Sequence, residues 1–207
     1  EESLFYPPIG LLKLATFHRQ RGDEVKFVIG CNKAIFQVAD MFSHEILWDR
    51  IYITTLFTFD WKNIVKTINF YKNAVGGSIH KIYVGGIMAS LMPDDIYEET
   101  GIQPVIGILD SPQKIGFNGN ENIDLLPPDY SVLDNRIYAI NDTYYAYTTR
   151  GCKNRCSWCG VPDIEPTYCN YIDIKPMIRQ MRATYGDKSR LKLMDNNLLV
   201  SPNLEQI

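Results

Sequence analysis

The chain has 207 residues, a formal net charge of −3, 45% hydrophobic residues and 22% charged residues. This composition is typical of a globular protein, and the slightly acidic balance gives no general electrostatic reason to expect nucleic-acid binding. No run of about 18 apolar residues indicates a membrane span, and the first residues lack the basic and apolar segments of a signal peptide. The missing initiator Met and the abrupt C-terminus predict that the chain is a piece of a longer protein.

The first half of the chain alternates between helical and strand-like patterns. Apolar residues at helical spacing predict helices at about 11–22, 34–47, 60–74 and 93–101. Apolar and β-branched runs predict strands at 25–29, 50–56, 81–86 and 104–108. This alternation predicts an α/β fold with a doubly wound, Rossmann-like parallel sheet, whose ligand crevice lies at the carboxyl ends of the strands. Gly85 and Gly86 lie at such an end, where they either let a ligand approach the backbone or make a tight turn.

The second half begins with many turn formers and then returns to the strand and helix pattern. Residues 110–143 have little periodicity, which predicts a linker. An aromatic, β-branched strand is expected at 144–149, a helix at 172–185 and a second strand with its loop at 191–198. The strand at 144–149 leads directly into the segment that contains most of the cysteines.

Three of the five cysteines, Cys152, Cys156 and Cys159, have the spacing Cys-x3-Cys-x2-Cys. Clustered cysteines in an odd total indicate a metal site in a reducing cytoplasm and not a disulfide framework. Thiolates are soft ligands that select iron–sulfur clusters, zinc or copper(I). A four-iron cluster held by three cysteines keeps one iron open, whereas a closed zinc or ferredoxin-type site needs a fourth ligand, for which Cys169 is the candidate.

The cysteine spacing, with Trp158 before the last cysteine and Gly160-Val161-Pro162 after it, resembles the signature loop of the radical S-adenosylmethionine (SAM) enzymes. The resemblance implies that the three cysteines hold a [4Fe–4S] cluster whose open iron binds SAM, and that one electron cleaves SAM to a 5′-deoxyadenosyl radical. It also implies that Trp158 and Gly160 contact SAM and that residues 144–207 form the first β/α units of a partial, TIM-type barrel, truncated here.

The residues 195–197, Asp-Asn-Asn, end the second barrel strand and resemble the Asp-Asp-Asn of the cobalamin-associated branch of that family. Asp195 and Asn197 match this pattern and Asn196 departs from it, so Asp195 and Asn197 are expected to bind SAM. Asp195 could equally cap the next helix. Arg150, with Lys153 and Arg155, is expected to add positive charge that lowers the pKa of the neighbouring thiols and favours reduction.

The first half of the chain resembles the cobalamin-binding-type domain that precedes many radical SAM barrels. The resemblance is carried by residues 6–11 (Tyr-Pro-Pro-Ile-Gly-Leu), residues 21–25 (Arg-Gly-Asp-Glu-Val) and Gly85-Gly86. The Asp-x-His-x-x-Gly motif that supplies an axial imidazole to cobalt is absent from the sequence, and His18, His44 and His80 are expected to be surface or capping residues. Cobalamin therefore either binds without a protein histidine or has been lost, and loss is the favoured alternative.

These patterns predict a cobalamin-binding-type domain at 1–115, a linker at 116–143 and the start of the barrel at 144–207. The predicted function is that of a radical SAM enzyme acting on an unknown substrate, with methyl transfer favoured by the N-terminal domain. The alternatives are a methylthiotransferase-like enzyme and a non-catalytic metal-binding or electron-transfer module. A flavodoxin- or ferredoxin-like electron donor and a cytoplasmic location are expected, and this piece alone is expected to be inactive.

Overall fold

The computed structural model describes residues 5–36 and 48–206, and the contacts of the chain divide it into two compact units. One unit comprises residues 27–107, and the other comprises residues 1–26 together with residues 108–207. This division does not follow the domain boundaries expected at residues 115 and 143, and those boundaries stay a prediction. In the described part of the chain, no helix is both long enough and apolar enough to span a membrane.

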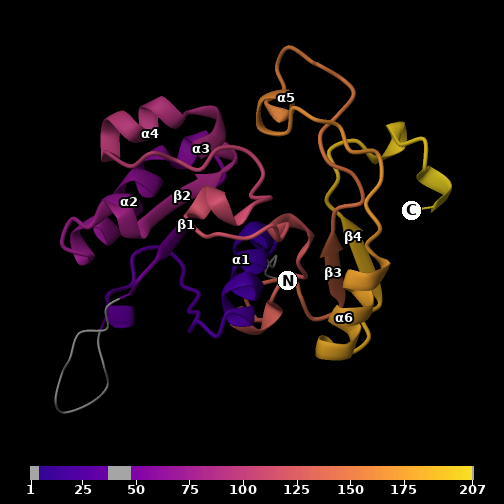
Figure 1. Ribbon diagram of the computed structural model, residues 1–207, viewed down its shortest axis with the longest axis horizontal. Coiled ribbons are helices and arrows are strands. Elements are labelled where there is room, and N and C mark those ends of the chain that lie inside the picture. The colour runs from indigo at the N-terminus through magenta and orange to yellow at the C-terminus, as the bar shows by residue number, and fades with distance from the viewer. Residues whose placement is uncertain (1–4, 37–47, 207) are drawn as a thin grey trace. The chain divides into compact units, whose positions relative to one another are not determined.

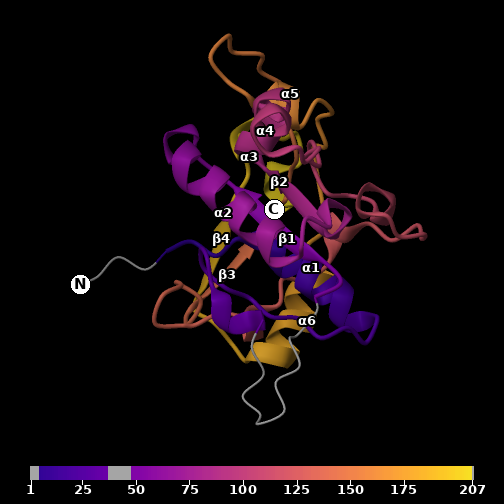
Figure 2. The ribbon, with the colours of Figure 1, turned by 90° about the vertical axis from the view of Figure 1, so that its left-hand side faces the viewer.

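The unit of residues 27–107 is built on a two-stranded parallel sheet (Figure 1). Strand β1 (Ile51–Thr55) pairs with β2 (Ile82–Gly86), with Ile51 opposite Ile82 and Thr55 opposite Gly86. The connection between them is α2 (Trp61–Ala74), which lies along both strands in Figures 1 and 2. After β2 come α3 (Ile87–Leu91) and α4 (Pro93–Thr100). A parallel pair needs such a crossover connection, and a helix usually supplies it.

One hydrophobic core joins these elements. It contains Ile68 and Tyr71 of α2, Val84 of β2, Met88 of α3 and Ile96 of α4, all of them buried. Helix α4 has Pro93 at its first position and ends at a left-handed glycine, as its sequence predicts. The helices α2 and α4 and the strands β1 and β2 are therefore confirmed close to their expected bounds.

Two strands expected at the boundaries of this unit are wrong. Residues 25–29 and 104–108 form no strand and belong to no sheet in the described part of the chain. The first segment is only partly covered, with Ile29 61% accessible. The second has a backbone hydrogen bond to β2, from Val105 N to Val84 O at 2.8 Å. Pro104 also has no N–H group to donate to a ladder. The helix expected at 34–47 lies mostly outside the described residues, and its first part is a 3₁₀ turn at Lys33–Phe36.

The other unit contains a second parallel pair, β3 (Thr143–Ala146) with β4 (Arg190–Leu193), in which Thr143 lies opposite Arg190. Between these strands the chain forms the cysteine loop, the short helix α5 (Val161–Ile164) and α6 (Lys175–Tyr185), which ends before Gly186 as expected. All residues of β3 are buried, whereas β4 is mostly exposed. The parallel strands expected on either side of the cysteine loop are confirmed.

Helix α1 (Ile9–Gln20) belongs to the same unit as the cysteine loop. Its Leu12 and Phe17 are buried, and its Thr16 hydroxyl donates to the Pro127 carbonyl at 2.6 Å. The segment expected to be a linker forms short 3₁₀ turns, among them Ile123–Leu125 and Tyr130–Val132, that contact this helix. Parts of the segment at 116–143 therefore pack against α1, although the segment lacks the periodicity of a long helix or strand.

Candidate metal centre

The three clustered cysteines lie on a loop whose two ends are joined by backbone hydrogen bonds. After β3 the chain reaches Arg150, and it returns antiparallel to itself at Cys169. Arg150 N donates to Cys169 O at 3.0 Å, and Cys169 N donates to Arg150 O at 2.9 Å. One step further out, Ile172 N donates to Thr148 O at 2.7 Å. Residues 151–168 therefore form a closed excursion at the carboxyl end of β3, and this excursion is called the cysteine loop below.

The cysteines of the loop are free and half-buried, and one of their sulfur atoms accepts hydrogen bonds. The Sγ atom of Cys152 accepts from Asn154 N at 3.4 Å and from the side-chain amide of Asn197 at 3.8 Å. The structure thus brings together Cys152 and Asn197, two of the expected site residues. Hydrogen bonds to cysteine sulfur are a usual feature of iron–sulfur sites, where they tune the reduction potential.

The donor set fits a thiolate-bound metal by its chemistry. Three free thiols within one loop are soft donors that suit iron–sulfur clusters or zinc. Among the residues that the structure describes, no group of three or more His, Cys, Asp or Glu side chains is close enough to hold a metal ion. The site is therefore defined by the loop and its donors, and the metal-bound arrangement of the thiolates stays a prediction.

Cys169, the candidate fourth ligand, lies at the base of the loop. Its backbone pairs with Arg150, while its side chain is exposed and its Sγ donates to the Tyr171 carbonyl at 3.5 Å. The fifth cysteine, Cys31, is exposed in the unit of residues 27–107.

Two further expected site residues lie on the loop itself. Trp158 is 86% exposed, so its indole is accessible and is not a core residue that packs the loop. Gly160 precedes α5, and its carbonyl accepts from Asp163 N at 3.2 Å and from Ile164 N at 3.1 Å. Whether either residue contacts SAM stays a prediction.

Asp195 joins the loop after β4 to the end of β3. Its Oδ1 atom accepts from Thr148 N at 3.0 Å, from the Thr148 hydroxyl at 2.9 Å, from the Thr149 hydroxyl at 2.7 Å and from Thr149 N. Both threonines are 1% exposed, so these hydrogen bonds are shielded from water. Asp195 does not cap a helix, because its partners lie at the end of a strand. This carboxylate instead fixes the segment that leads into the cysteine loop.

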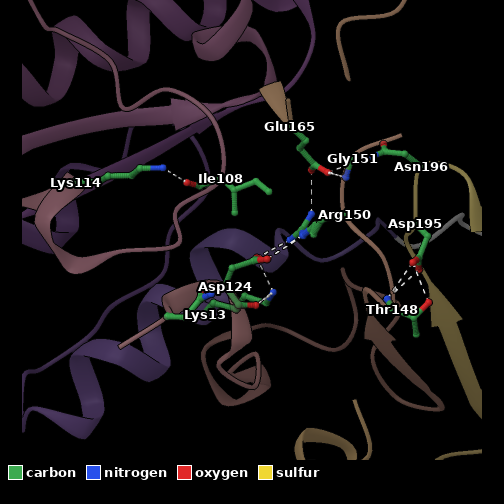
Figure 3. A network of polar contacts seen from close by, with 11 residues as sticks. Lys13, Ile108, Lys114, Asp124, Thr148, Arg150, Gly151, Glu165, Asp195 and Asn196 are labelled. Carbon is green, nitrogen blue, oxygen red and sulfur yellow. Dashed lines mark hydrogen bonds and ion pairs between the residues drawn. The ribbon is translucent and has the colours of Figure 1, made fainter. Parts of the chain in front are cut away.

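A buried ionic network lies beside the base of the loop (Figure 3). The guanidinium of Arg150 donates to both carboxylate oxygens of Asp124, at 2.8 and 2.5 Å, and to Glu165 Oε1 at 3.1 Å. It also lies over the ring of Tyr147, 3.5 Å from the centroid. Arg150 was expected to add positive charge beside the thiols, but two carboxylates neutralise it. Burial opposes its charge, yet Asp124 raises the pKa of Arg150 above its ordinary value.

Lys13 extends this network to α1. Its ammonium donates to Asp124 Oδ1 at 2.8 Å and to the Asp124 carbonyl, across 111 positions of sequence. Its side chain is 7% exposed, and this burial lowers its pKa below the ordinary value for lysine. Two cations, Lys13 and Arg150, are thus balanced by two carboxylates, Asp124 and Glu165. Sequence reasoning missed Lys13, Asp124 and Glu165, because no spacing rule connects positions so far apart.

Gly86 is required by the packing of its own sheet. Its φ is +103°, and a Cβ atom there would lie 2.3 Å from Thr55 O and 2.8 Å from Thr55 N. At Gly85 an added Cβ would make only an ordinary contact, 3.5 Å from Val105 O. The close approach of β1 thus accounts for Gly86 without a ligand, and the role of the two glycines in a cobalamin-type crevice stays a prediction.

The expected surface or capping role of His18 is wrong in part. His18 is 8% exposed, near the end of α1, and its Nδ1 lies 2.7 Å from Asp23 Oδ2. His80 is exposed in a 3₁₀ turn, as expected, and His44 lies outside the described residues.

Compared with models of known protein families and with curated protein sequences, the chain matches none of them.

Proposed function

We propose that the chain is part of a radical SAM enzyme in which Cys152, Cys156 and Cys159 hold a [4Fe–4S] cluster. The observation that carries the proposal is the position of three free thiols, spaced Cys-x3-Cys-x2-Cys, on a closed loop at the carboxyl end of a parallel strand. The carboxyl ends of parallel strands are where β/α barrels carry their active sites. When bound, such a cluster supplies the electron that cleaves SAM to methionine and a 5′-deoxyadenosyl radical.

The residues around the loop have separate roles in this proposal. Asn154 N and the Asn197 amide donate to the Cys152 sulfur and so hold this atom in place within the loop. Trp158, Gly160, Asp195 and Asn197 are the proposed SAM-binding residues. Through the four hydrogen bonds that its Oδ1 atom accepts from Thr148 and Thr149, Asp195 also holds the end of β3 in place.

The same proposal extends to the fold of the longer protein. Each unit contains one pair of parallel strands joined through at least one helix, which is the repeating element of both Rossmann-like sheets and β/α barrels. Residues 144–207 are proposed to begin a TIM-type barrel, and residues 1–115 to form a Rossmann-like domain of the cobalamin-binding type, with Gly85 and Gly86 at its crevice. The favoured reaction is methyl transfer to an unknown substrate, and methylthiolation is the enzymatic alternative. A flavodoxin- or ferredoxin-like protein is the proposed electron donor.

A second candidate, a non-catalytic metal-binding or electron-transfer module, is favoured by one observation. The backbone pairing of Cys169 with Arg150 keeps this fourth thiol at the base of the loop that carries the other three. A site with four cysteine ligands is closed and leaves no iron open for SAM.

The deciding experiment is anaerobic reconstitution with iron and sulfide, followed by metal analysis and EPR spectroscopy with and without SAM. About four irons per chain and a SAM-dependent change of the EPR signal are expected for a cluster held by three cysteines. Cys156→Ser should then lose the cluster, while Cys169→Ser and the exposed control Cys31→Ser should retain it. One zinc per chain, or a cluster that is lost in Cys169→Ser and does not respond to SAM, would establish the second candidate instead.

A further inference from the structure

One carboxylate connects the three segments that meet at the base of the cysteine loop. Glu165 follows α5 directly, and its Oε2 atom accepts from Gly151 N at 2.5 Å and from the Asn196 side-chain amide at 3.1 Å. Its Oε1 atom accepts from Arg150 Nη1 at 3.1 Å. Gly151 begins the loop, Arg150 precedes it and Asn196 lies in the segment after β4, so a single side chain holds all three together (Figure 3).

The contacts of Glu165 with Arg150 and Gly151 are largely protected from solvent, whereas the Asn196 amide is exposed. Its side chain is 11% exposed and that of Arg150 is 13% exposed. Hydrogen bonds to an ionised carboxylate are stronger than those between neutral groups, and a low local dielectric strengthens them further. Loss of the negative charge at this position would leave Gly151 N and the Asn196 amide with a weaker acceptor.

The backbone around Glu165 is packed as closely as its side chain. Gly151 has a φ of +69°, and a Cβ atom there would lie 2.7 Å from Thr167 O and 3.0 Å from Glu165 O. The two backbone hydrogen bonds between Arg150 and Cys169 lie immediately outside this contact. None of these interactions involves a sulfur atom, so the loop is closed by contacts that do not require a metal.

We propose that Glu165 is a positioning residue that closes the cysteine loop before a metal binds and thereby increases the affinity of Cys152, Cys156 and Cys159 for that metal. A loop that is already ordered loses less conformational entropy when the thiolates converge on the metal. The role in metal binding rests on the proposed function, whereas the closure is a property of the metal-free chain. Residues that orient metal ligands without binding the metal typically change its affinity by about 10- to 100-fold when they are replaced.

The first test measures the closure without any metal. Glu165→Gln keeps the size of the side chain and removes its charge, and Asp163→Asn, at an exposed acid of α5, is the matched control. Amide hydrogen exchange of the reduced, metal-free chain is followed by mass spectrometry in peptides that cover residues 150–165. Exchange in these peptides is expected to be at least about tenfold faster in Glu165→Gln and unchanged in Asp163→Asn, with α2 and α6 unaffected in both.

The second test measures metal affinity with Cd²⁺ as the probe. Titration of each variant is followed by the ultraviolet absorbance that a thiolate gains when it binds cadmium. Glu165→Gln is expected to bind about 10- to 100-fold more weakly and to reach the same final spectrum as the unmodified chain, because its cysteines are unchanged. Asn196→Ala removes only one of the three contacts and provides a milder variant if Glu165→Gln does not fold; it should show the same effects at smaller size.

The outcomes separate this proposal from the proposed function. Unchanged hydrogen exchange of the loop in Glu165→Gln would overturn the positioning role, because Glu165 would then not close the loop. Faster exchange throughout the chain would also overturn it, because the substitution would then have a general effect on folding. A changed final cadmium spectrum would also overturn it, because Glu165 would then be a ligand. A looser loop and weaker cadmium binding in Glu165→Gln, in a chain that forms no SAM-responsive cluster, would support the positioning role and reject the radical SAM function.

Discussion

Replacement of Gly151 by alanine would test how closely the base of the cysteine loop is packed. Gly151 has a φ of +69°, a conformation that costs an L-residue about 1–2 kcal/mol. The new Cβ atom would also lie 2.7 Å from the backbone oxygen of Thr167, which cannot move without opening the loop. Gly22, at the end of α1, has a similar φ of +86°, but no described atom lies within 4 Å of the position that a Cβ would take.

The pair of variants separates backbone strain from steric overlap. Both alanines lower the conformational entropy of the unfolded chain, and this effect stabilises the folded state by about 0.4–1 kcal/mol in each case. Gly22→Ala is therefore expected to lower the free energy of unfolding by about 0–1.5 kcal/mol. Gly151→Ala bears an additional cost of about 1–3 kcal/mol, because the close contact forces the backbone of the loop to shift. The difference between the two variants is the quantity that the structure predicts.

The assay is urea unfolding of the reduced, metal-free chain followed by far-ultraviolet circular dichroism. Unchanged m-values would show that the two variants expose the same surface on unfolding, so that their free energies can be compared. Equal destabilisation by Gly22→Ala and Gly151→Ala would refute the reasoning, because Gly151 would then lie free of residues 165–167.

Three further predictions concern single side chains in the same unit. Asp124→Asn should destabilise the chain by about 3–5 kcal/mol in urea unfolding, since it leaves two buried cations with one carboxylate. Asp134→Asn, at an ion pair with the exposed Arg136, should have a much smaller effect, and similar effects of the two variants would contradict the burial of the network. Asp195→Asn should lower the free energy of unfolding by about 1–3 kcal/mol, because a neutral amide oxygen replaces a charged acceptor of several hydrogen bonds. Unchanged stability together with lost SAM binding would instead indicate that Asp195 acts only through a direct contact with SAM. Burial raises the pKa of Tyr185 to about 12, so the stabilisation that comes from its neutral hydroxyl is complete below pH 10 and is lost as the pH rises from 10 to 12. The difference in unfolding free energy between the unmodified chain and Tyr185→Phe, measured by urea unfolding against pH, should fall over this range, and a constant difference would exclude the raised pKa.

The ionic network changes the electrostatic interpretation of the cysteine loop. The sequence places Arg150 next to the cysteines and suggests a positive environment for the thiols. In the structure its charge is shared between Asp124 and Glu165, both of them 12% exposed or less. Arg150 therefore acts mainly on the shape of the loop, and any effect of positive charge on the thiols would come from the exposed Lys153 and Arg155.

Local sequence signals placed most of the helices and strands. Helix α4 was found at both ends because Pro93 suits its first turn and Gly101 adopts the left-handed conformation after its last residue. The short helices α3 and α5 were missed, since helices of one turn contain too few residues for a periodic pattern. The segments 25–29 and 104–108 have the residue types of strands, but a strand also requires a partner with matching hydrogen bonds, and no local pattern reports whether one is present.

The sequence by itself determined what depends on neighbouring residues: the positions of strands β1, β2, β3 and β4, the longer helices and the spacing of the three cysteines on one loop. Only the tertiary structure decided how that loop is closed, because Lys13 and Asp124 are 111 positions apart and Glu165 meets Arg150, Gly151 and Asn196 through the fold. Buried charges must find partners in order to leave water, and those partners are chosen by the three-dimensional path of the chain. The chemistry of the candidate site is therefore local in sequence, whereas its closure depends on contacts that only folding creates.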